Sequence, residues 1–325
     1  MNNEKELKLN TLIGEDYSNI AGVVVKRNSK TVFENYYNGY NKNDTIHVAS
    51  VTKSIISALI GIAIDKGFIK SIEQNILDFF QGYKIKRGEK RIQKIAIRDL
   101  LTMTAPYKFK YEPYTKVYSS DDWTKAVLDL IGGKGEIGEF KYTTVGLQVL
   151  SGIITNATGH TIVDFASENL FKHLDIQTPK NVTINSKDEH IAFLKDKHRS
   201  GWVIDPKGIN TAGWGLALTT IDMAKIGQLY LNMGIWNGKQ ILSAKWIEHS
   251  TKEHSRLGKL PYGYLWWIID GVNNRDFAAI GDGGNVIYVS PEKNIVVAIA
   301  SQFMPRAKDR IEMIKKNIIP LFEND

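Results

Sequence analysis

The chain has 325 residues and a net charge of +7, and its apolar share of 43% and charged share of 24% are those of a soluble globular protein. A chain of this length can bury a sizeable core, in one large domain or two closely joined lobes. It contains no cysteine, which excludes disulfides, thiolate nucleophiles and cysteine-based zinc or iron–sulfur sites.

The first residues, MNNEKELKLNTLIGEDY, are polar and charged and lack the apolar core of a signal peptide. No apolar stretch approaches the roughly 18 residues that a membrane span needs. We therefore expect no transmembrane helix and a cytoplasmic location, although a removed leader is compatible with the sequence.

Two β-rich runs follow, IAGVVV at 20–25 and TVFENYY at 31–37, and the polar segment between them predicts a hairpin. Residues 50–66 are almost entirely apolar and end at Gly67, a typical C-cap residue. A helix that is apolar on nearly all sides is expected to lie buried at the centre of the protein.

The middle of the chain is mostly helical in character, and strand character returns after the glycine-rich stretch at 213–218 and the helix behind it. The predicted helices cover 97–103, 122–131, 144–158 (ended by Gly159), 161–174, 220–233 and about 306–321. The later predicted strands cover 262–270, 277–280, 285–289 and 295–301.

Strands at both ends with helices between them predict an α/β (α+β) fold. Its antiparallel sheet would be built from N- and C-terminal segments and flanked by helices, with a mostly helical lobe inserted. We expect one domain over 1–325, with the α/β lobe at about 18–80 and 205–325 and the helical lobe at about 81–204. The junction of the two lobes is the place where a cleft is expected.

The basic run at 84–94 (KIKRGEKRIQK) is interrupted by Glu89 and lacks the interleaved aromatic residues on which single-stranded nucleic acids stack. We interpret it as a solvated face and expect no nucleic-acid partner. No P-loop or G-x-G-x-x-G stands between a strand and a helix, and the seven histidines show no metal-ligand spacing. We therefore expect no cofactor and no metal.

Ser50-Val51-Thr52-Lys53 is an S-x-x-K tetrad at the start of the predicted buried helix. Residues three apart share a helix face, so the Lys53 amine can approach the Ser50 hydroxyl. Burial and the positive end of the helix dipole both disfavour an ammonium, which lowers the pKa of the lysine. A hydroxyl beside such a base is an activated nucleophile, and the Ser50 N–H can form half of an oxyanion hole.

The tetrad alone is a weak signal, because an N-cap serine followed by an ordinary lysine has the same pattern. A second copy at 290–293 (SPEK) is interpreted as a turn, since it contains proline and lies between predicted strands. A Ser–His–Asp hydrolase is the alternative chemistry, but its G-x-S-x-G elbow is absent.

The surrounding sequence resembles the serine β-lactamase and penicillin-binding-protein family. It is most similar to the class C branch, which also contains esterases, D-amino-acid-releasing peptidases and aminohexanoate-dimer hydrolases. The resemblance runs from about 20 to 305 and rests on five segments in the family's order. These segments are HVASVTKSI (47–55), IRDLLTMTA (97–105), FKYTTVGLQVLSGIITNATG (140–159), AGWGLALTTIDMAKIGQLYLNMG (212–234) and YGYLWW (262–267).

The resemblance implies roles for residues of the first two motifs. The family's nucleophile and base fall on Ser50 and Lys53, and its Tyr-x-Asn motif falls on Tyr142-Thr143-Thr144. The tyrosine is implied to act as base or proton shuttle among serine, lysine and leaving group. Thr144 replaces an asparagine that holds the acyl-side amide of the substrate, which speaks against penicillin-like substrates.

The third family motif, Lys-Thr-Gly or His-x-Gly, falls on Asp282-Gly283-Gly284, and the N–H of Asn285 is then implied as the second oxyanion donor. An aspartate thus stands where the family has a cation that attracts a substrate carboxylate. A charge pair at ~4 Å is worth about 4 kcal/mol at an effective dielectric of 20. We therefore predict a substrate that is neutral, or cationic near Asp282.

Several aromatic residues lie near these motifs. Tyr107, together with Tyr111 and Tyr114, is a candidate for an apolar substrate pocket, with ordinary packing as the alternative. Trp214 and the pair Trp266–Trp267 are interpreted as core or sheet-face residues. His249 and His254 are interpreted as surface residues.

We therefore expect a serine hydrolase that forms an acyl-enzyme with a small ester or amide substrate, of esterase or amidase type, as a monomer or homodimer. The alternatives are a D-amino-acid peptidase or β-lactamase, and, from another class, a catalytically impaired penicillin-binding or sensor module. Thr144 and Asp282 count against the first two, and the joint presence of Ser50, Lys53 and Tyr142 counts against the third. Whether Lys53 or Tyr142 is the kinetic base stays open.

Overall fold

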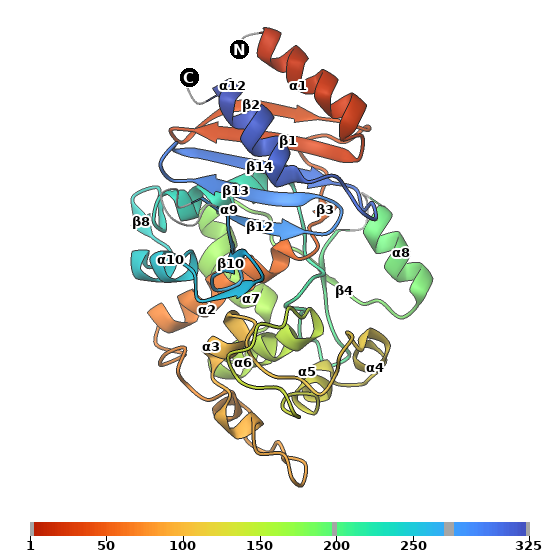
Figure 1. The fold of residues 1–325 in the computed structure, drawn as a ribbon, viewed down its shortest axis with the longest axis vertical. Helices are drawn as coiled ribbons and strands as arrows, with labels where there is room; N and C mark the ends of the chain where they lie inside the picture. The colour runs from red at the N-terminus through yellow and green to blue at the C-terminus, as the bar shows by residue number, and fades with distance from the viewer. Residues whose placement is uncertain (1–2, 197–199, 270–275, 323–325) are drawn as a thin grey trace.

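The computed structural model describes residues 3–196, 200–269 and 276–322. Its centre is an eight-stranded sheet in the order β2-β1-β14-β13-β12-β11-β10-β9, in which every neighbouring pair is antiparallel (Figure 1). The strands are β1 (Ile20–Arg27), β2 (Lys30–Tyr36), β9 (Ser255–Leu257), β10 (Leu260–Tyr262), β11 (Trp267–Ile268), β12 (Phe277–Gly281), β13 (Asn285–Ser290) and β14 (Ile295–Ser301). The sheet therefore joins the beginning of the chain to its end, as predicted.

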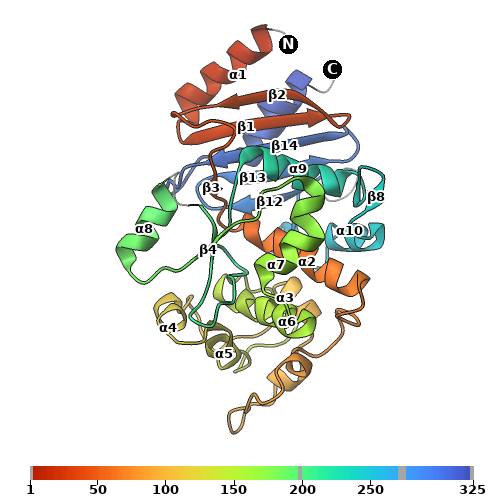
Figure 2. The same cartoon turned by 180° about the vertical axis from the view of Figure 1, so that it is seen from behind.

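Helices cover both faces of this sheet. On one face lie α1 (Asn3–Asp16) and the helical segment formed by α11 (Arg310–Met313), a π-helical turn (Ile314–Ile318) and α12 (Ile319–Phe322). On the other face α9 (Thr220–Leu231) packs against β13 and β14, and α2 (Val51–Asp65) packs against β12 (Figure 2). The start of α2 thereby reaches the end of β12.

Several of the remaining helices form the part of the molecule farthest from the chain termini (Figure 1). Its helices are α3 (Ile97–Leu101), α4 (Tyr114–Tyr118), α5 (Trp123–Leu128), α6 (Gln148–Thr158) and α7 (Ile162–Ala166), while α8 (Lys187–Lys195) and α10 (Ala244–Ser250) lie at the sides. Two-stranded pairs are β3 (Ile46–His47) with β6 (Ala217–Leu218), β4 (Asn181–Val182) with β5 (Trp202–Val203), and β7 (Ile235–Trp236) with β8 (Lys239–Gln240). The division into lobes near 80 and 205 stays a prediction.

The fold class is confirmed, and most predicted elements are present, with three differences. The run at 262–270 is not one strand. The chain turns between β10 and β11, where Gly263 N–H donates to Trp266 O (2.8 Å). The predicted end of the run, Asp270, lies outside the described residues. The last helix begins at Arg310, four residues later than expected, because the Asp309 carboxylate accepts the N–H groups of Ile311 and Glu312. The helices α1, α4, α8 and α10 were not among the predicted ones.

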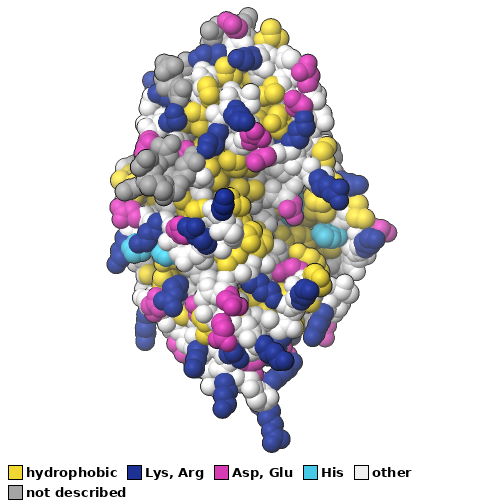
Figure 3. Space-filling view, viewed as in Figure 1, with side chains coloured by type: hydrophobic (Ala, Val, Ile, Leu, Met, Phe, Trp, Pro, Cys, Tyr) yellow, Lys and Arg dark blue, Asp and Glu magenta, His cyan; other side chains and the backbone are white. Residues whose placement is uncertain are grey.

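The basic run at 84–94 lies in an exposed loop at the end of the molecule opposite the termini, where Lys and Arg side chains point to solvent (Figures 1 and 3). Two of its cations pair with acids of neighbouring segments, Lys86 with Asp129 (3.3 Å) and Arg91 with Glu136 (2.8 Å). Within the described ranges, no helix is long and apolar enough to cross a bilayer.

Candidate active site

Ser50 and Lys53 meet at the start of α2, as the tetrad predicts. Ser50 occupies the N-cap position, directly after Ala49, whose φ of 49° lies in the left-handed region and bends the chain sharply into the helix. The Nζ of Lys53 lies 2.7 Å from Ser50 Oγ. The lysine side chain is 1% exposed, because nearly every residue of α2 around it is buried. The hydroxyl of Ser50 and the amine of Lys53 are therefore held in hydrogen-bonding contact inside the protein.

The environment of Lys53 weakens its hold on a proton. Burial lowers the pKa of Lys53 to about 7, while the negative charges of Asp282 and Glu112 oppose this shift. Two further acceptors fix the amine, since Nζ donates to Gly213 O (2.8 Å) and to Thr144 Oγ1 (3.2 Å). A lysine with a pKa near neutrality is partly unprotonated at pH 7, which a general base requires.

Tyr142 completes this cluster. Its ring stacks on Trp267 at a centroid distance of 5.8 Å, and Lys53 Nζ lies 4.9 Å from the ring centroid. Burial raises the pKa of Tyr142 to about 12, and a hydrogen bond with the Ser50 side chain opposes the rise. At neutral pH the phenol therefore carries its proton and suits the role of a proton relay better than that of a phenolate base.

The turn between β12 and β13 forms the wall beside Ser50. A Cβ atom on Gly281 would lie 2.3 Å from Val48 O and 3.1 Å from Ser50 N, so only glycine allows β12 to pass this close to Ser50. Asp282 is exposed, and Gly283 and Gly284 follow with φ of +81° and +95°. The next residue, Asn285, is 1% exposed.

Polar contacts hold this turn from both sides. The Asn285 side-chain amide donates to Asp282 O (2.9 Å) and to His47 O (3.4 Å). From behind, Asn19 Nδ2 donates to Gly283 O (2.7 Å), and Asn19 Oδ1 accepts from Arg310 (2.5 Å). Arg310 is 3% exposed, and burial lowers its pKa to about 10.

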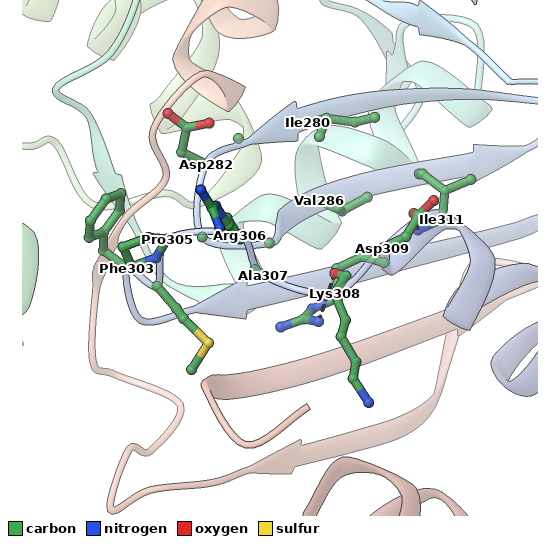
Figure 4. Close-up of a pocket in the computed structure, with 15 residues that line it drawn as sticks. Ile280, Asp282, Val286, Phe303, Pro305, Arg306, Ala307, Lys308, Asp309 and Ile311 are labelled. Carbon is green, nitrogen blue, oxygen red and sulfur yellow. Dashed lines mark hydrogen bonds between the residues drawn. The ribbon is translucent and has the colours of Figure 1, made fainter. Parts of the chain in front are cut away.

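A pocket of about 450 Å³ lies behind the turn (Figure 4). Asp282 lies at one end of this pocket, and Lys308 and Ile311 lie at the other. The Asp282 carboxylate points away from these two residues. Asp282 also lines the cavity into which Ser50 opens, so its carboxylate lies at the boundary between the two.

The cavity above Ser50 has a volume of about 620 Å³ and appears as a hollow beside α8 (Figure 3). Thr144 and Asp282 line it together with Ser50. Its aromatic wall is formed by Tyr114, Tyr118, Trp123 and Trp214, and Trp214 Nε1 donates to Tyr118 Oη (2.8 Å). His190 and Leu194 of α8 close the far side. Such a cavity can hold a small substrate with an apolar acyl or alcohol group.

The structure thus brings Ser50, Lys53, Tyr142, Thr144 and the 282–285 turn together. It places Tyr107 elsewhere: this side chain is 7% exposed, packs with its hydroxyl against Gly146 and does not line the cavity. Tyr114, seven residues on, lines it instead, while Tyr111 is 79% exposed.

Three features of the site were not found from the sequence. Trp214 was interpreted as a core or sheet-face residue, but it lines the cavity, and so do His190 and other residues of α8. Glu112 accepts the Val145 N–H (3.0 Å) and adds negative charge near Lys53.

His254 is exposed and His249 partly so, in line with their assignment to the surface. Within the described segments, no three His, Asp or Glu side chains gather as a metal site.

Comparison with known proteins fits this geometry. The profile of the Beta-lactamase family matches residues 15–318, and the chain belongs to that family of hydrolases. Over 306 residues it is 22% identical to the 6-aminohexanoate-dimer hydrolase of Paenarthrobacter ureafaciens. The alignment covers 86% of this chain and 72% of the relative.

Solved structures show the same fold. A putative 6-aminohexanoate-dimer hydrolase from Bacillus anthracis superposes with a TM-score of 0.72 at 21% identity, over 97% of this chain and 79% of the other. A putative β-lactamase from Bacteroides dorei superposes with a TM-score of 0.76 at 16% identity, over 99% of both chains. The resemblance read from the sequence segments is therefore confirmed.

Proposed function

We propose that the protein is a serine hydrolase of esterase or amidase type that cleaves a small ester or amide through an acyl-enzyme on Ser50. The observation that carries this proposal is the buried Lys53 amine 2.7 Å from Ser50 Oγ, with its pKa lowered to about 7. A structural lysine gains nothing from such burial, whereas a base for a serine hydroxyl needs it.

In the first half-reaction Ser50 Oγ attacks the substrate carbonyl carbon and its proton passes to Lys53 Nζ. Tyr142 then relays a proton to the oxygen or nitrogen of the leaving group, and the bond between that atom and the carbonyl carbon breaks. In the second half-reaction water attacks the acyl carbon, gives a proton to the Lys53–Tyr142 pair, and Ser50 leaves with a proton. The products are a carboxylic acid and an alcohol or amine.

Two backbone N–H groups are needed to stabilise the oxyanion in both half-reactions. Ser50 N–H, at the start of α2, is the first. The second is assigned to the turn after Gly281: Asn285 N–H is the donor predicted from the sequence, and Asp282 N–H is a further candidate because Gly281 passes so close to Ser50 N.

Charge in the site favours a neutral or cationic substrate. Asp282 lines the cavity, and the charges of both Asp282 and Glu112 act on Lys53. A substrate carboxylate placed near Asp282 would be repelled, whereas an alkylammonium group would be attracted and could also contact the aromatic wall. The related hydrolase from Paenarthrobacter ureafaciens acts on an aminohexanoate dimer, and amide substrates therefore belong in the first screen.

The proposal is tested by intact-protein mass after incubation with p-nitrophenyl acetate, p-nitrophenyl butyrate, a fluorophosphonate and a penicillin. Wild type is compared with Ser50→Ala and with Ser57→Ala, which removes a buried hydroxyl two turns further along α2. We expect ester turnover and fluorophosphonate labelling in wild type and Ser57→Ala only. A lasting penicillin adduct on Ser50 would instead support a penicillin-binding or sensor protein, and labelling that survives Ser50→Ala would refute the nucleophile.

A further inference from the structure

The Gly213 carbonyl is one of three acceptors that orient the Lys53 amine, and its position is tightly defined. Lys53 Nζ donates to Gly213 O over 2.8 Å. A Cβ atom on Gly213 would lie 2.4 Å from Thr144 O, so the loop at 212–216 is packed directly against the second motif. A small movement of this loop would therefore move the base relative to Ser50.

His47 contacts the same loop at Gly215. Gly215 N–H donates to His47 Nε2 (3.1 Å), and in the adjacent backbone Val48 N–H donates to Leu216 O (2.9 Å). The His47 carbonyl accepts the Asn285 amide of the β12–β13 turn (3.4 Å). One residue thus contacts both the loop that carries the Lys53 acceptor and the turn beside Ser50.

The contact with Gly215 requires an unprotonated Nε2, because a protonated imidazole has no acceptor. The ring meets Phe193 edge-on (centroids 5.2 Å apart) and Trp214 edge-on (5.8 Å), and it opens onto the cavity. Burial, and then the nearby His190, lower the pKa of His47 to about 3. The imidazole therefore stays neutral, with Nδ1 as its N–H, throughout the range in which Lys53 titrates.

We propose that His47 is a positioning residue of the acylation site, whose Nε2 acceptor fixes the Gly215 N–H and, through the 212–216 loop, aims the Lys53 amine at Ser50. This inference rests on the proposed function, because it assigns a role in aiming the base of that reaction. His47 itself neither touches the reacting atoms nor transfers a proton.

Two substitutions separate this role from packing. His47→Gln retains an acceptor, since the glutamine Oε1 can reach the place of Nε2, whereas His47→Phe retains the ring and removes the acceptor. His254→Phe is the control. This imidazole also makes one hydrogen bond to the backbone, although to a carbonyl (His249 O, 2.8 Å), and stacks on a ring (Tyr264, 4.2 Å), but it does not line the cavity. The readouts are fluorophosphonate labelling, the rate of acylation by p-nitrophenyl acetate from pH 5 to 9, and Tm.

A base misplaced by about 1 Å can cost up to a hundredfold in rate, so we expect His47→Phe to slow acylation ten- to a hundredfold. The acid limb of its pH profile should also move to lower pH, because a displaced Gly213 carbonyl no longer stabilises the Lys53 ammonium. His47→Gln should recover most of the rate and the wild-type limb, and His254→Phe should match wild type in both.

Two results would overturn the positioning role: a wild-type rate and pH limb in His47→Phe, or equal losses in His47→Phe and His47→Gln that follow a lowered Tm. A wild-type protein that is not labelled at Ser50 would refute the proposed function itself, which keeps the two failures distinct.

Discussion

Replacing Gly281 by alanine tests how closely the site depends on the approach of β12 to the nucleophile. The added Cβ would lie 2.3 Å from Val48 O and 3.1 Å from Ser50 N. Ordinary van der Waals contact for a Cβ atom begins near 3.4 Å. The strand and the start of α2 must therefore separate by about 1 Å, which widens the gap between Ser50 N–H and any oxyanion donor of the turn. A misplacement of that size is worth about a hundredfold in rate, or roughly 3 kcal/mol of transition-state stabilisation.

The assay is the single-turnover rate of acylation by p-nitrophenyl acetate, measured together with Tm. Gly14→Ala is the control, because a Cβ atom on that residue of α1 meets no atom within 4 Å. We expect Gly281→Ala to acylate about a hundredfold more slowly while remaining folded. Acylation at the wild-type rate by a folded Gly281→Ala protein would refute the reasoning, since the oxyanion site would then tolerate a shifted strand.

Three further predictions concern charge and pocket shape. Lys53→Met should abolish ester turnover yet raise stability most at acidic pH. The folded-state pKa of Lys53, about 7, lies below the unfolded value of 10.5. The buried ammonium therefore destabilises wild type by up to about 5 kcal/mol below pH 7, and this destabilisation shrinks as pH rises toward 10.5. Equal gains in Tm at pH 5 and pH 9 would contradict this prediction. Asp282→Asn should raise kcat/KM for an anionic ester relative to a cationic one, by about tenfold after allowance for its exposure, and unchanged ratios would exclude Asp282 from substrate recognition. Trp214→Ala should lower the preference for p-nitrophenyl butyrate over acetate by about tenfold, as read from the two kcat/KM values, because it opens the aromatic wall.

The elements that the sequence predicts well are those whose pattern does not depend on distant partners. The apolar run that became α2 ends at Gly67, and the run that became α6 ends at Gly159 with φ of 72°, so both ends were visible locally. By contrast, α1 buries only Leu9 and Ile13 at about 1% exposure, against strands placed there by the rest of the chain. Only two of the four leucine and isoleucine residues in the described part of this polar segment are fully buried, so its pattern gives little signal on its own.

The residues of the site likewise fall into those that a local sequence pattern predicts and those that only the folded chain brings together. Ser50 and Lys53 lie three residues apart on one helix, so the pattern alone predicts their contact. Trp214 and His190 come from separate segments that meet only in the folded protein, with ring centroids 4.9 Å apart, and no local spacing marks them. Tyr107 and Tyr114 lie in one stretch of chain. Tyr107 bridges to Ile131 and packs against Gly146, whereas Tyr114 begins α4 and lines the cavity, so the fold and not the residue type decides which tyrosine reaches it.

The connection between Arg310, Asn19 and the Gly283 carbonyl has a consequence for synthesis on the ribosome. Strand β1 pairs with β14, Val24 opposite Ala298, and the turn beside Ser50 is held by residues from both of these distant parts of the chain. While the middle of the chain is being made, β1 has no sheet partner beyond β2, and its apolar residues stay uncovered. Because non-local strand pairing is slow and leaves edges exposed, this order of synthesis leaves β1 open to non-native pairing until β14 is made. The turn beside Ser50 therefore gains its full set of contacts only after Arg310, 291 residues beyond Asn19, has been made.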